Sequence, residues 1–135
     1  MKAYTDILQS RKLAEILSHN TADNTYERVV IAGCNLDIPE ERQYVHRDIP
    51  FMFFSGVGVP CWSLAALLDV LPTTIGNFFE KTALRLRMDK GENDFSIWYE
   101  NFDCGDVAEG LDVIGDNSID ACYEMILRLH EQKLI

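Results

Sequence analysis

Apolar residues recur with the period of an α-helix near both ends of the chain. The first stripe comprises Ile7, Leu8, Leu13, Ala14, Ile16 and Leu17. Thr5 or Asp6 can cap a helix that begins there. The second stripe comprises Ile119, Cys122, Met125, Ile126 and Leu129. Asn117 is placed to cap this last helix, with Asp120 three residues later in a capping-box-like position.

The centre of the chain alternates with the two-residue period of a β-strand. Every second side chain is apolar in residues 84–88 and again in residues 95–100. Residues 89–94 connect these two runs and contain a glycine and an asparagine, which favour a turn. The pattern therefore predicts a β-hairpin, and residues 111–114 are expected to form one more short strand.

Shorter runs lie between the first helix and the hairpin. Residues 19–24 are turn formers, and the β-branched residues 28–33 predict a short strand. Residues 35–50 are polar and contain two prolines, which indicates a loop. Residues 51–54 read Phe-Met-Phe-Phe, an apolar run suited to a strand that is covered on both faces.

A short buried helix is predicted before the hairpin. Residues 56–60 contain two glycines and a proline and are expected to break the preceding strand. Residues 62–71 are apolar almost all round, and Pro72 stops the helix that they predict. The order α-β-β-α-β-β-(β)-α predicts an α+β fold, an antiparallel or mixed sheet of four to five strands with three helices. A chain of 135 residues suits a single domain, residues 1–135.

Negative charge is concentrated in the last third of the chain. Residues 1–99 hold 10 basic and 13 acidic side chains, so residues 100–135 supply seven of the ten net negative charges. Such a field repels nucleic acid and anionic membranes, and it attracts basic partners or cations. The predicted acidic binding surface consists of Glu100, Asp103, Asp106, Glu109 and Asp112.

The sequence indicates an intracellular protein. Charged and polar side chains interrupt the N-terminal residues, so the apolar core of a signal peptide is missing. No run reaches the roughly 18 apolar residues that span a bilayer. Cys34, Cys61, Cys104 and Cys122 lack the paired spacing of a disulfide framework and are expected to be reduced thiols. We expect a soluble cytoplasmic protein that does not bind membranes.

Cys61 is the candidate catalytic nucleophile. It precedes a predicted helix start, where the helix dipole lowers the pKa of a thiol. His46 is the nearest histidine in the sequence and is the candidate base. The alternative is a buried cysteine that packs beside Trp62 and has no chemical role.

No pattern in the sequence predicts a cofactor or a metal site. Gly56-Val57-Gly58 lacks the third glycine of a dinucleotide-binding turn. The cysteines and the three histidines are too dispersed in sequence to indicate a zinc site. The carboxylates from residue 103 to residue 112 recur at every third position, whereas a calcium loop of the EF-hand type needs alternate positions and a central glycine.

Arg85, Arg87 and Trp98 are candidate binding residues on the hairpin. If the apolar side chains of the first strand face the core, both arginines point outward, and Trp98 can share their face. Two guanidinium groups beside an indole could hold an anion or a base by charge and stacking. The alternative is a cross-strand contact, with Glu100 as a partner, that stabilises the hairpin.

Three segments together resemble a known group of proteins. They are residues 9–17 (QSRKLAEIL), residues 59–68 (VPCWSLAALL) and residues 116–126 (DNSIDACYEMI) with Leu129-His130-Glu131. The set resembles small uncharacterised proteins encoded in gut-anaerobe genomes, often within phages and mobile elements. In those proteins the last helix often begins Asn-Pro, and here Ser118 replaces the proline. The resemblance implies a family but no activity.

Three functions remain open on this basis. The first is a small non-enzymatic binding or regulatory protein that acts through protein contacts, with a basic protein partner or a second copy of itself. The second is an acidic mimic of nucleic acid that blocks a host defence enzyme, since spaced carboxylates can imitate phosphates. The third is a thiol enzyme that uses Cys61. Direct nucleic-acid binding is disfavoured by the net charge of −10.

Overall fold

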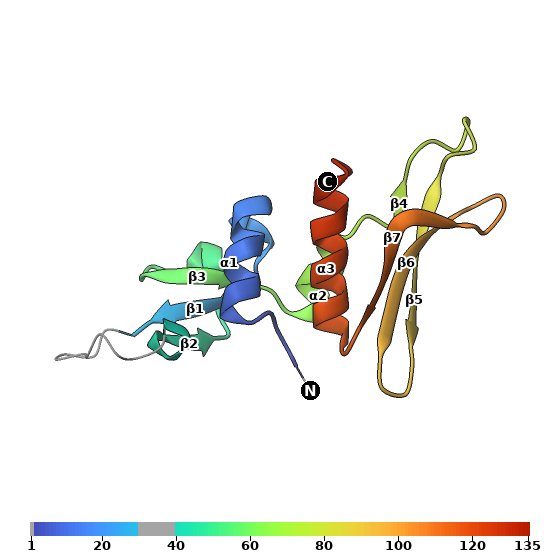
Figure 1. The fold of residues 1–135 in the computed structure, drawn as a ribbon. Helices are drawn as coiled ribbons and strands as arrows, with labels where there is room; N and C mark the ends of the chain where they lie inside the picture. The colour runs from blue at the N-terminus through green and yellow to red at the C-terminus, as the bar shows by residue number, and fades with distance from the viewer. Residues whose placement is uncertain (1, 30–39) are drawn as a thin grey trace. The chain divides into compact units, whose positions relative to one another are not determined.

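The computed structural model describes residues 2–29 and 40–135. It confirms the α+β class, because helices accompany two antiparallel sheets of three and four strands. The chain divides into two compact units. We call residues 3–66 the N-terminal unit, and residues 67–135 together with Lys2 the C-terminal unit. Their boundary falls within helix α2, Leu64–Val70 (Figure 1). The single domain expected from the chain length stays a prediction.

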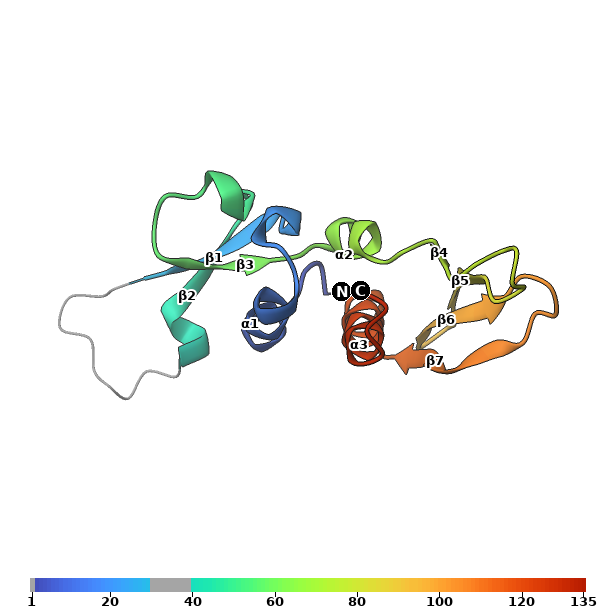
Figure 2. The same ribbon diagram turned by 90° about the horizontal axis from the view of Figure 1, so that it is seen from above.

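The N-terminal unit combines one helix with a three-stranded sheet (Figure 1). Its elements are α1 (Ile7–Ile16), β1 (Asn24–Arg28), β2 (Tyr44–Arg47) and β3 (Gly58–Cys61), with short 3-10 turns η1 (His19–Thr21), η2 (Glu40–Gln43) and η3 (Phe51–Phe53). The strand order is β2-β1-β3, and both pairings are antiparallel. Helix α1 lies against β3 (Figure 2).

Helix α1 begins where the sequence predicts. Asp6 is its N-cap and accepts a hydrogen bond from the Gln9 backbone, while the Gln9 side chain accepts one from the Asp6 backbone. This reciprocal capping box satisfies two amide groups that the first helical turn cannot pair. Ile7 and Leu13 are buried, whereas Leu8 is exposed because it lies about 100° around the helix from Ile7.

The strands of this unit differ from the sequence-based prediction. Strand β1 runs from Asn24 to Arg28, so it occupies part of the expected turn at residues 19–24. Residues 30–33 of the expected strand lie outside the described residues, as does Cys34. Strand β2 lies inside the predicted loop at residues 35–50. Its residues alternate between half-buried and exposed, because only one face of this edge strand is covered.

The prediction for residues 51–60 was wrong. Residues 51–54 form the 3-10 turn η3 instead of a buried strand, and Met52 and Phe53 are exposed. The expected break at residues 56–60 contains β3, in which Pro60 pairs with Thr25 of β1. A proline fits there because β3 is an edge strand, and only one side of an edge strand needs its N–H groups for pairing.

The C-terminal unit combines a four-stranded sheet with helix α3. Its strands are β4 (Thr74–Ile75), β5 (Leu84–Lys90), β6 (Phe95–Asn101) and β7 (Val107–Gly115), and α3 spans Ser118–Glu131. The order is β4-β5-β6-β7, with antiparallel pairing throughout. The predicted hairpin is confirmed as β5 and β6, and Met88 pairs with Ile97 in its register. The predicted strand at residues 111–114 is part of the longer β7.

Helix α3 covers one face of this sheet, along β6 and β7 (Figures 1 and 2). Asn117 caps the helix by accepting a hydrogen bond from the Asp120 backbone at 2.9 Å, as predicted. The whole predicted stripe is buried: Ile119, Cys122, Met125, Ile126 and Leu129. These side chains meet the inner face of the sheet, which contributes Ile97, Tyr99, Leu111 and Val113. We call the opposite face the outer face.

The connection from β7 to α3 is tight. A methyl group added at Gly115 would lie 3.0–3.2 Å from the backbone and side chain of Ala121. A glycine lets the end of β7 approach the first turn of α3 this closely without displacing Ala121. At its other end the helix is joined to the sheet by Arg128, whose guanidinium donates to the backbone oxygens of Gly110 and Asp112.

Strand β7 is irregular between its two ends. Val113 pairs with Ile97 in regular register, but Glu100 pairs with Val107, so the pairing shifts between Trp98 and Glu100. Gly110 lies in this bulge with φ +76°, a left-handed conformation that side chains disfavour. A bulge of this kind bends the strand and increases its local twist.

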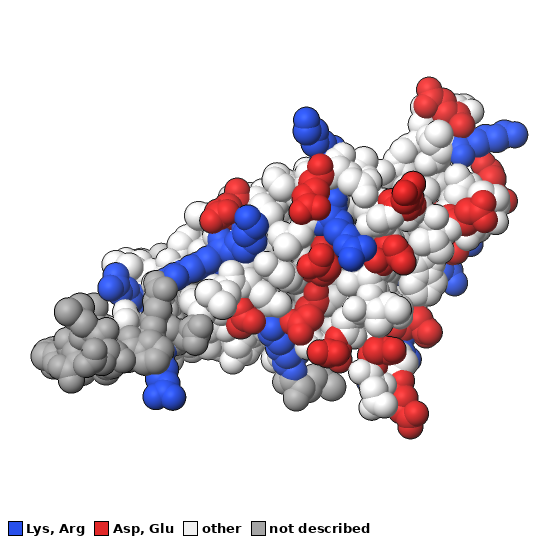
Figure 3. Space-filling model, in the orientation of Figure 1, with Lys and Arg blue, Asp and Glu red and all other residues white. Residues whose placement is uncertain are grey.

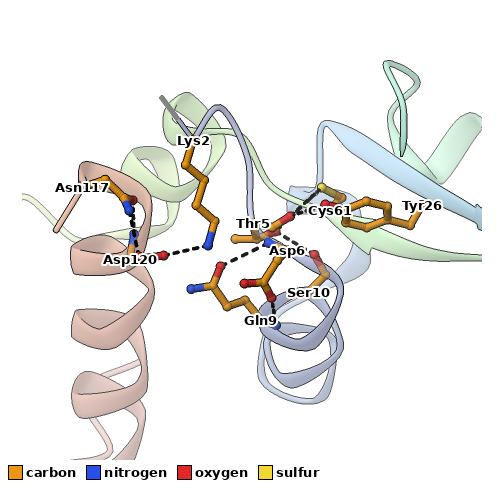
Figure 4. A network of polar contacts seen from close by, with 9 residues as sticks. All are labelled: Lys2, Thr5, Asp6, Gln9, Ser10, Tyr26, Cys61, Asn117 and Asp120. Carbon is orange, nitrogen blue, oxygen red and sulfur yellow. Dashed lines mark hydrogen bonds and ion pairs between the residues drawn. The ribbon is translucent and has the colours of Figure 1, made fainter. Parts of the chain in front are cut away.

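Charged side chains of both signs lie on the surface (Figure 3). Figure 3 shows Asp and Glu side chains interspersed with fewer Lys and Arg on the face in view. Asp103, Asp106, Glu109 and Asp112 are all exposed. At the start of α3, the Lys2 ammonium lies 2.7 Å from the Asp120 carboxylate (Figure 4). Within residues 2–29 and 40–135, no helix has both the length and the apolar character needed to cross a bilayer.

Candidate functional site

Cys61 ends strand β3 and is fully buried. The helix α2 that follows starts at Leu64 rather than at Trp62, so the thiol does not lie at a helix N-terminus as expected. Burial raises the pKa of the Cys61 thiol to about 11. Only about one part in ten thousand of such a thiol is ionised at pH 7, and the thiolate is the nucleophilic form.

The neighbours of Cys61 have a structural role that centres on Thr5. The Thr5 hydroxyl lies 2.7 Å from the Ser10 hydroxyl and 3.7 Å from the Cys61 sulfur (Figure 4). The same hydroxyl accepts a hydrogen bond from the Trp62 backbone. The Tyr26 hydroxyl donates to the Thr5 backbone oxygen at 2.7 Å. This cluster joins the N-terminal segment to β1 and β3, and Cys61 within it has no exposed surface.

His46 is not placed to act as a base for Cys61. Strands β2 and β3 lie on opposite sides of β1, where His46 pairs with Tyr26 and Cys61 pairs with Asn24. The His46 ring stacks on Tyr4 and contacts the Asn24 amide oxygen at 2.9 Å. Burial lowers the pKa of His46. The two proposed partners of a thiol mechanism therefore have separate structural contacts.

The outer face of the four-stranded sheet brings the predicted hairpin residues together. In the register of β5 and β6, Arg87 pairs with Trp98 and Arg85 pairs with Glu100. Paired residues point to the same side of a sheet, and α3 occupies the side to which Ile97 and Tyr99 point. Both arginines and Trp98 therefore share the outer face, as the alternation predicts.

The two guanidinium groups are engaged by one carboxylate. Glu100 lies 3.0 Å from Arg85 and 3.3 Å from Arg87, and its side chain is only 14% exposed. The Arg85 guanidinium also lies over the Phe102 ring, 5.4 Å from its centre. The structure thus fits the alternative in which the arginines stabilise the hairpin through Glu100. Glu100 belongs to this ion pair and not to an open acidic surface.

Next to this ion pair, the outer face contains a shallow depression of about 400 Å³ around Trp98. We call it the Trp98 depression. Its outward-facing side chains are Asp89, Ser96, Trp98, Val107, Asp112 and Ile114. Trp98 pairs with Asp112, and Ser96 pairs with Ile114, so β6 and β7 supply the floor. Ile114 is 74% exposed, so this face of the sheet presents a large apolar side chain to solvent.

The chemistry of the Trp98 depression is that of a site for cations with an apolar part. Two carboxylates, Asp89 and Asp112, stand among an indole and two aliphatic side chains, and the described residues that line it include no Lys or Arg. An indole face attracts an ammonium or guanidinium group, and carboxylates pair with it. Aliphatic side chains accommodate the methylene groups that precede such a charge.

Most of the predicted acidic residues lie elsewhere. Asp103 and Asp106 belong to the loop between β6 and β7, and Glu109 lies in the β7 bulge. Only Asp112 of the predicted set reaches the Trp98 depression. Among the residues that the structure describes, no three His, Cys, Asp or Glu side chains are grouped closely enough to hold a metal ion.

Sequence reasoning missed Asp89, Val107 and Ile114. Asp89 belonged to the predicted turn at residues 89–94. Ile114 belonged to the predicted strand at residues 111–114, but the prediction did not say which of its side chains were exposed. A signal was present for Ile114, because Leu111 and Val113 alternate with Asp112 and Ile114. The pairing of β7 with β6 across a bulge is not local in sequence, so the alternation alone could not place these residues beside Trp98.

Comparison with known proteins leaves the family open. No family model matches the chain, and no curated protein or solved structure is significantly similar to it. The resemblance to proteins of gut anaerobes and their phages stays a prediction.

Proposed function

We propose that this chain is a small intracellular binding or regulatory protein without enzymatic activity, which holds a basic segment of a partner protein on its outer face. The observation that carries the proposal is the Trp98 depression, with Asp89 and Asp112 beside a half-buried indole and the exposed Ile114. Exposed aromatic and aliphatic groups flanked by charge are typical of protein contact surfaces.

A lysine or arginine side chain satisfies every part of this surface at once. Its methylene groups would pack on Trp98 and Ile114, and its charge would lie between the two carboxylates. Residues on either side of it would cross the exposed β7, where Val107 is also exposed. A flat nucleic acid fits less well, because the carboxylates repel phosphates and Glu100 already pairs with Arg85 and Arg87.

Intrinsic fluorescence offers a direct test, because the chain has two tryptophans and Trp62 is fully buried. The probe is a 12-residue peptide that alternates Arg or Lys with Val, and its matched control replaces each basic residue by Glu. The basic peptide is expected to change the emission of Trp98 in a saturable manner that weakens with salt. In Trp98→Phe, the remaining Trp62 signal should stay unchanged during the titration.

A pair of charge-matched variants separates this site from general attraction. Asp89→Asn with Asp112→Asn removes both carboxylates of the Trp98 depression and should weaken binding about tenfold. Asp103→Asn with Glu109→Gln removes the same net charge elsewhere and should weaken it less than twofold. Equal losses in the two variants would instead indicate diffuse attraction, as nucleic-acid mimicry requires. No binding of the basic peptide would refute the proposal.

A further inference from the structure

A second feature of the C-terminal unit consists of two loops at one end of its sheet. One loop, residues 76–83, joins β4 to β5, and the other, residues 102–106, joins β6 to β7. We call the two loops together the aromatic tip, because three phenylalanines lie in them: Phe78, Phe79 and Phe102. Phe79 is 97% exposed and Phe78 is 60% exposed. The ring centres of Phe78 and Phe102 are 4.9 Å apart.

Hydrogen bonds hold the first loop of the tip in shape. The Asn77 side chain accepts from the Phe79 backbone at 2.9 Å, and the Asn77 backbone oxygen accepts from the Thr82 backbone at 3.1 Å. The Thr82 hydroxyl in turn accepts from the Asn77 backbone. Lys81 adopts a left-handed conformation with φ 57° to complete the turn. This turn presents Phe79 to solvent instead of folding it inward.

Asn101 joins the second loop to the first. Its side-chain amide donates to the Lys81 backbone oxygen at 3.1 Å, and its amide oxygen accepts from the Asp103 and Cys104 backbones. The Phe102 backbone also donates to the Ala83 oxygen. The aromatic tip is therefore a structured element rather than a loose loop that happens to expose apolar residues.

Exposure of the phenylalanine rings in the aromatic tip is unfavourable in free energy. A phenylalanine that is almost fully exposed forfeits the free energy that its burial would provide, and exposed aromatics of this kind concentrate at contact surfaces. A shaped loop that holds such a ring in solvent lowers the entropy lost on binding, because the ring's backbone is already fixed. Both properties are those of an anchor that enters a pocket of another molecule.

We propose that the aromatic tip inserts Phe79 into an apolar pocket of a partner protein whose rim is basic. The basic rim follows from charge, because Glu80, Asp103 and Asp106 are exposed in the same two loops and Lys81 is their one basic residue. This inference goes beyond the basic segment proposed for the Trp98 depression, and it uses different residues. Either contact can exist without the other.

A second copy of this chain is a poorer match for the tip. The N-terminal unit has a depression of about 390 Å³ lined by Asp6, Ile7, Leu8 and Tyr26, and the Trp98 depression has two carboxylates. Both therefore present acidic groups to an acidic tip. A lipid surface is also disfavoured, because the carboxylates around Phe79 are repelled by anionic headgroups.

Photo-crosslinking at the tip tests this proposal. A benzophenone amino acid is placed at position 79 of the full chain, which is expressed in cells that naturally carry it, and a parallel chain carries the same group at the exposed Phe53 of the N-terminal unit. Irradiation is expected to join position 79 to one protein with a basic surface. That protein is then purified, and its affinity for the unmodified chain is measured by calorimetry.

Substitutions then measure the contribution of the ring. Phe79→Ala should weaken binding of the purified partner by about ten- to hundredfold, since it removes a buried aromatic group. Phe79→Leu should retain most of the affinity, and Phe53→Ala should change it less than twofold. Trp98→Phe separates the two proposals, because it leaves the aromatic tip intact and alters only the depression.

Four outcomes would overturn the proposal. An adduct of the chain with itself, together with dimers in sedimentation, would identify a second copy as the occupant. Binding to vesicles of phosphatidylcholine and phosphatidylglycerol that is lost in Phe79→Ala would identify a membrane. No adduct at position 79, or equal affinity of Phe79→Ala and the unmodified chain for the crosslinked protein, would show that the tip is not an anchor.

Discussion

At the scale of single residues, Thr5 shows how much a buried hydroxyl can organise. It is fully buried, and its side chain contacts Ser10, Cys61 and the Trp62 backbone. Within the described part of the chain, no buried side-chain nitrogen or oxygen lacks a hydrogen-bond partner. The loss of one member of such a cluster leaves the others unsatisfied, which costs more than the bond itself contributes.

Thr5→Val is therefore expected to destabilise the protein by about 1–3 kcal/mol, although it keeps the shape of the side chain. The Trp62 amide and the Ser10 hydroxyl would both lose a partner. Urea unfolding, followed by circular dichroism, measures the change. Thr74→Val at an exposed position of β4 is the matched control and should change stability by less than about 0.5 kcal/mol.

Lys133 occupies the position after α3 where a glycine is usual. It has φ 58°, and the backbone of Leu134 donates to the Leu129 oxygen, which closes the helix end. Lys133→Gly should raise stability by about 0.5–1 kcal/mol, because glycine adopts this conformation without strain. A thermal melt measures the shift. An unchanged or lower melting temperature would show that the lysine charge at the helix end outweighs the strain.

Part of the candidate site was predictable residue by residue. Alternation along β5 and β6 placed Arg85, Arg87 and Trp98 on one face, and the register confirms that placement. Their role in binding stays a prediction. The ion pair with Glu100 was predicted only as an alternative. Alternation indicates the side of the sheet to which a side chain points, but it does not identify the residue that the side chain contacts.

At the scale of elements, local patterns were predicted and non-local ones were not. The hairpin β5–β6 has alternating apolar residues with a turn between them, and helix α3 has a periodic apolar stripe with a cap at its start. In both elements these signals lie within a few residues of one another. Strands β2 and β3 pair with β1 across 16 or more residues, and neither has a strong pattern of its own. Residues 51–54 were misread because a run of apolar side chains does not reveal whether other elements cover it.

Strand β7 is an edge strand, and Arg128 covers part of its open edge. The guanidinium donates to the Gly110 and Asp112 backbone oxygens, at 3.3 Å and 2.6 Å. Open edges recruit further strands, and a charged side chain that occupies their carbonyl groups prevents such pairing. The arginine thus protects the sheet from association at the position where α3 passes β7.

Arg128→Ala should lower stability by about 0.5–1.5 kcal/mol and promote self-association through the exposed edge. Sedimentation velocity at rising protein concentration measures the association. Glu124→Ala is the control, because it removes the ion pair with Arg128 at 3.5 Å but keeps the bonds to β7. A variant that is destabilised but remains monomeric at every concentration would show that the bulge alone protects the edge.

At the scale of the whole molecule, buried thiol and phenol groups determine how stability depends on pH in the alkaline range. Burial raises the pKa of both the Cys61 and Cys122 thiols from 9.0 to about 11. Burial also raises the pKa of Tyr26 and Tyr99. A group whose pKa is higher in the folded state binds its proton more tightly there, so folding is favoured below the unfolded pKa and loses this contribution as the pH rises.

The free energy of unfolding is therefore expected to be constant from pH 7 to about pH 8.5 and to fall between pH 9 and pH 11. Urea unfolding under reducing conditions across this range measures the slope. Cys122→Ala removes one of the two thiols and should make the slope shallower between pH 9 and pH 11. A flat profile in the unmodified protein would contradict the burial of these groups.

The close approach of Gly115 to Ala121 has a consequence for how this chain can diverge. A side chain at position 115 would crowd Ala121, so a larger residue there requires the start of α3 to shift by a few tenths of an ångström. Homologues that keep the fold should retain a small residue at both positions, together with a capping residue at position 117. This sparse signature could identify distant members of the lineage after overall similarity has been lost.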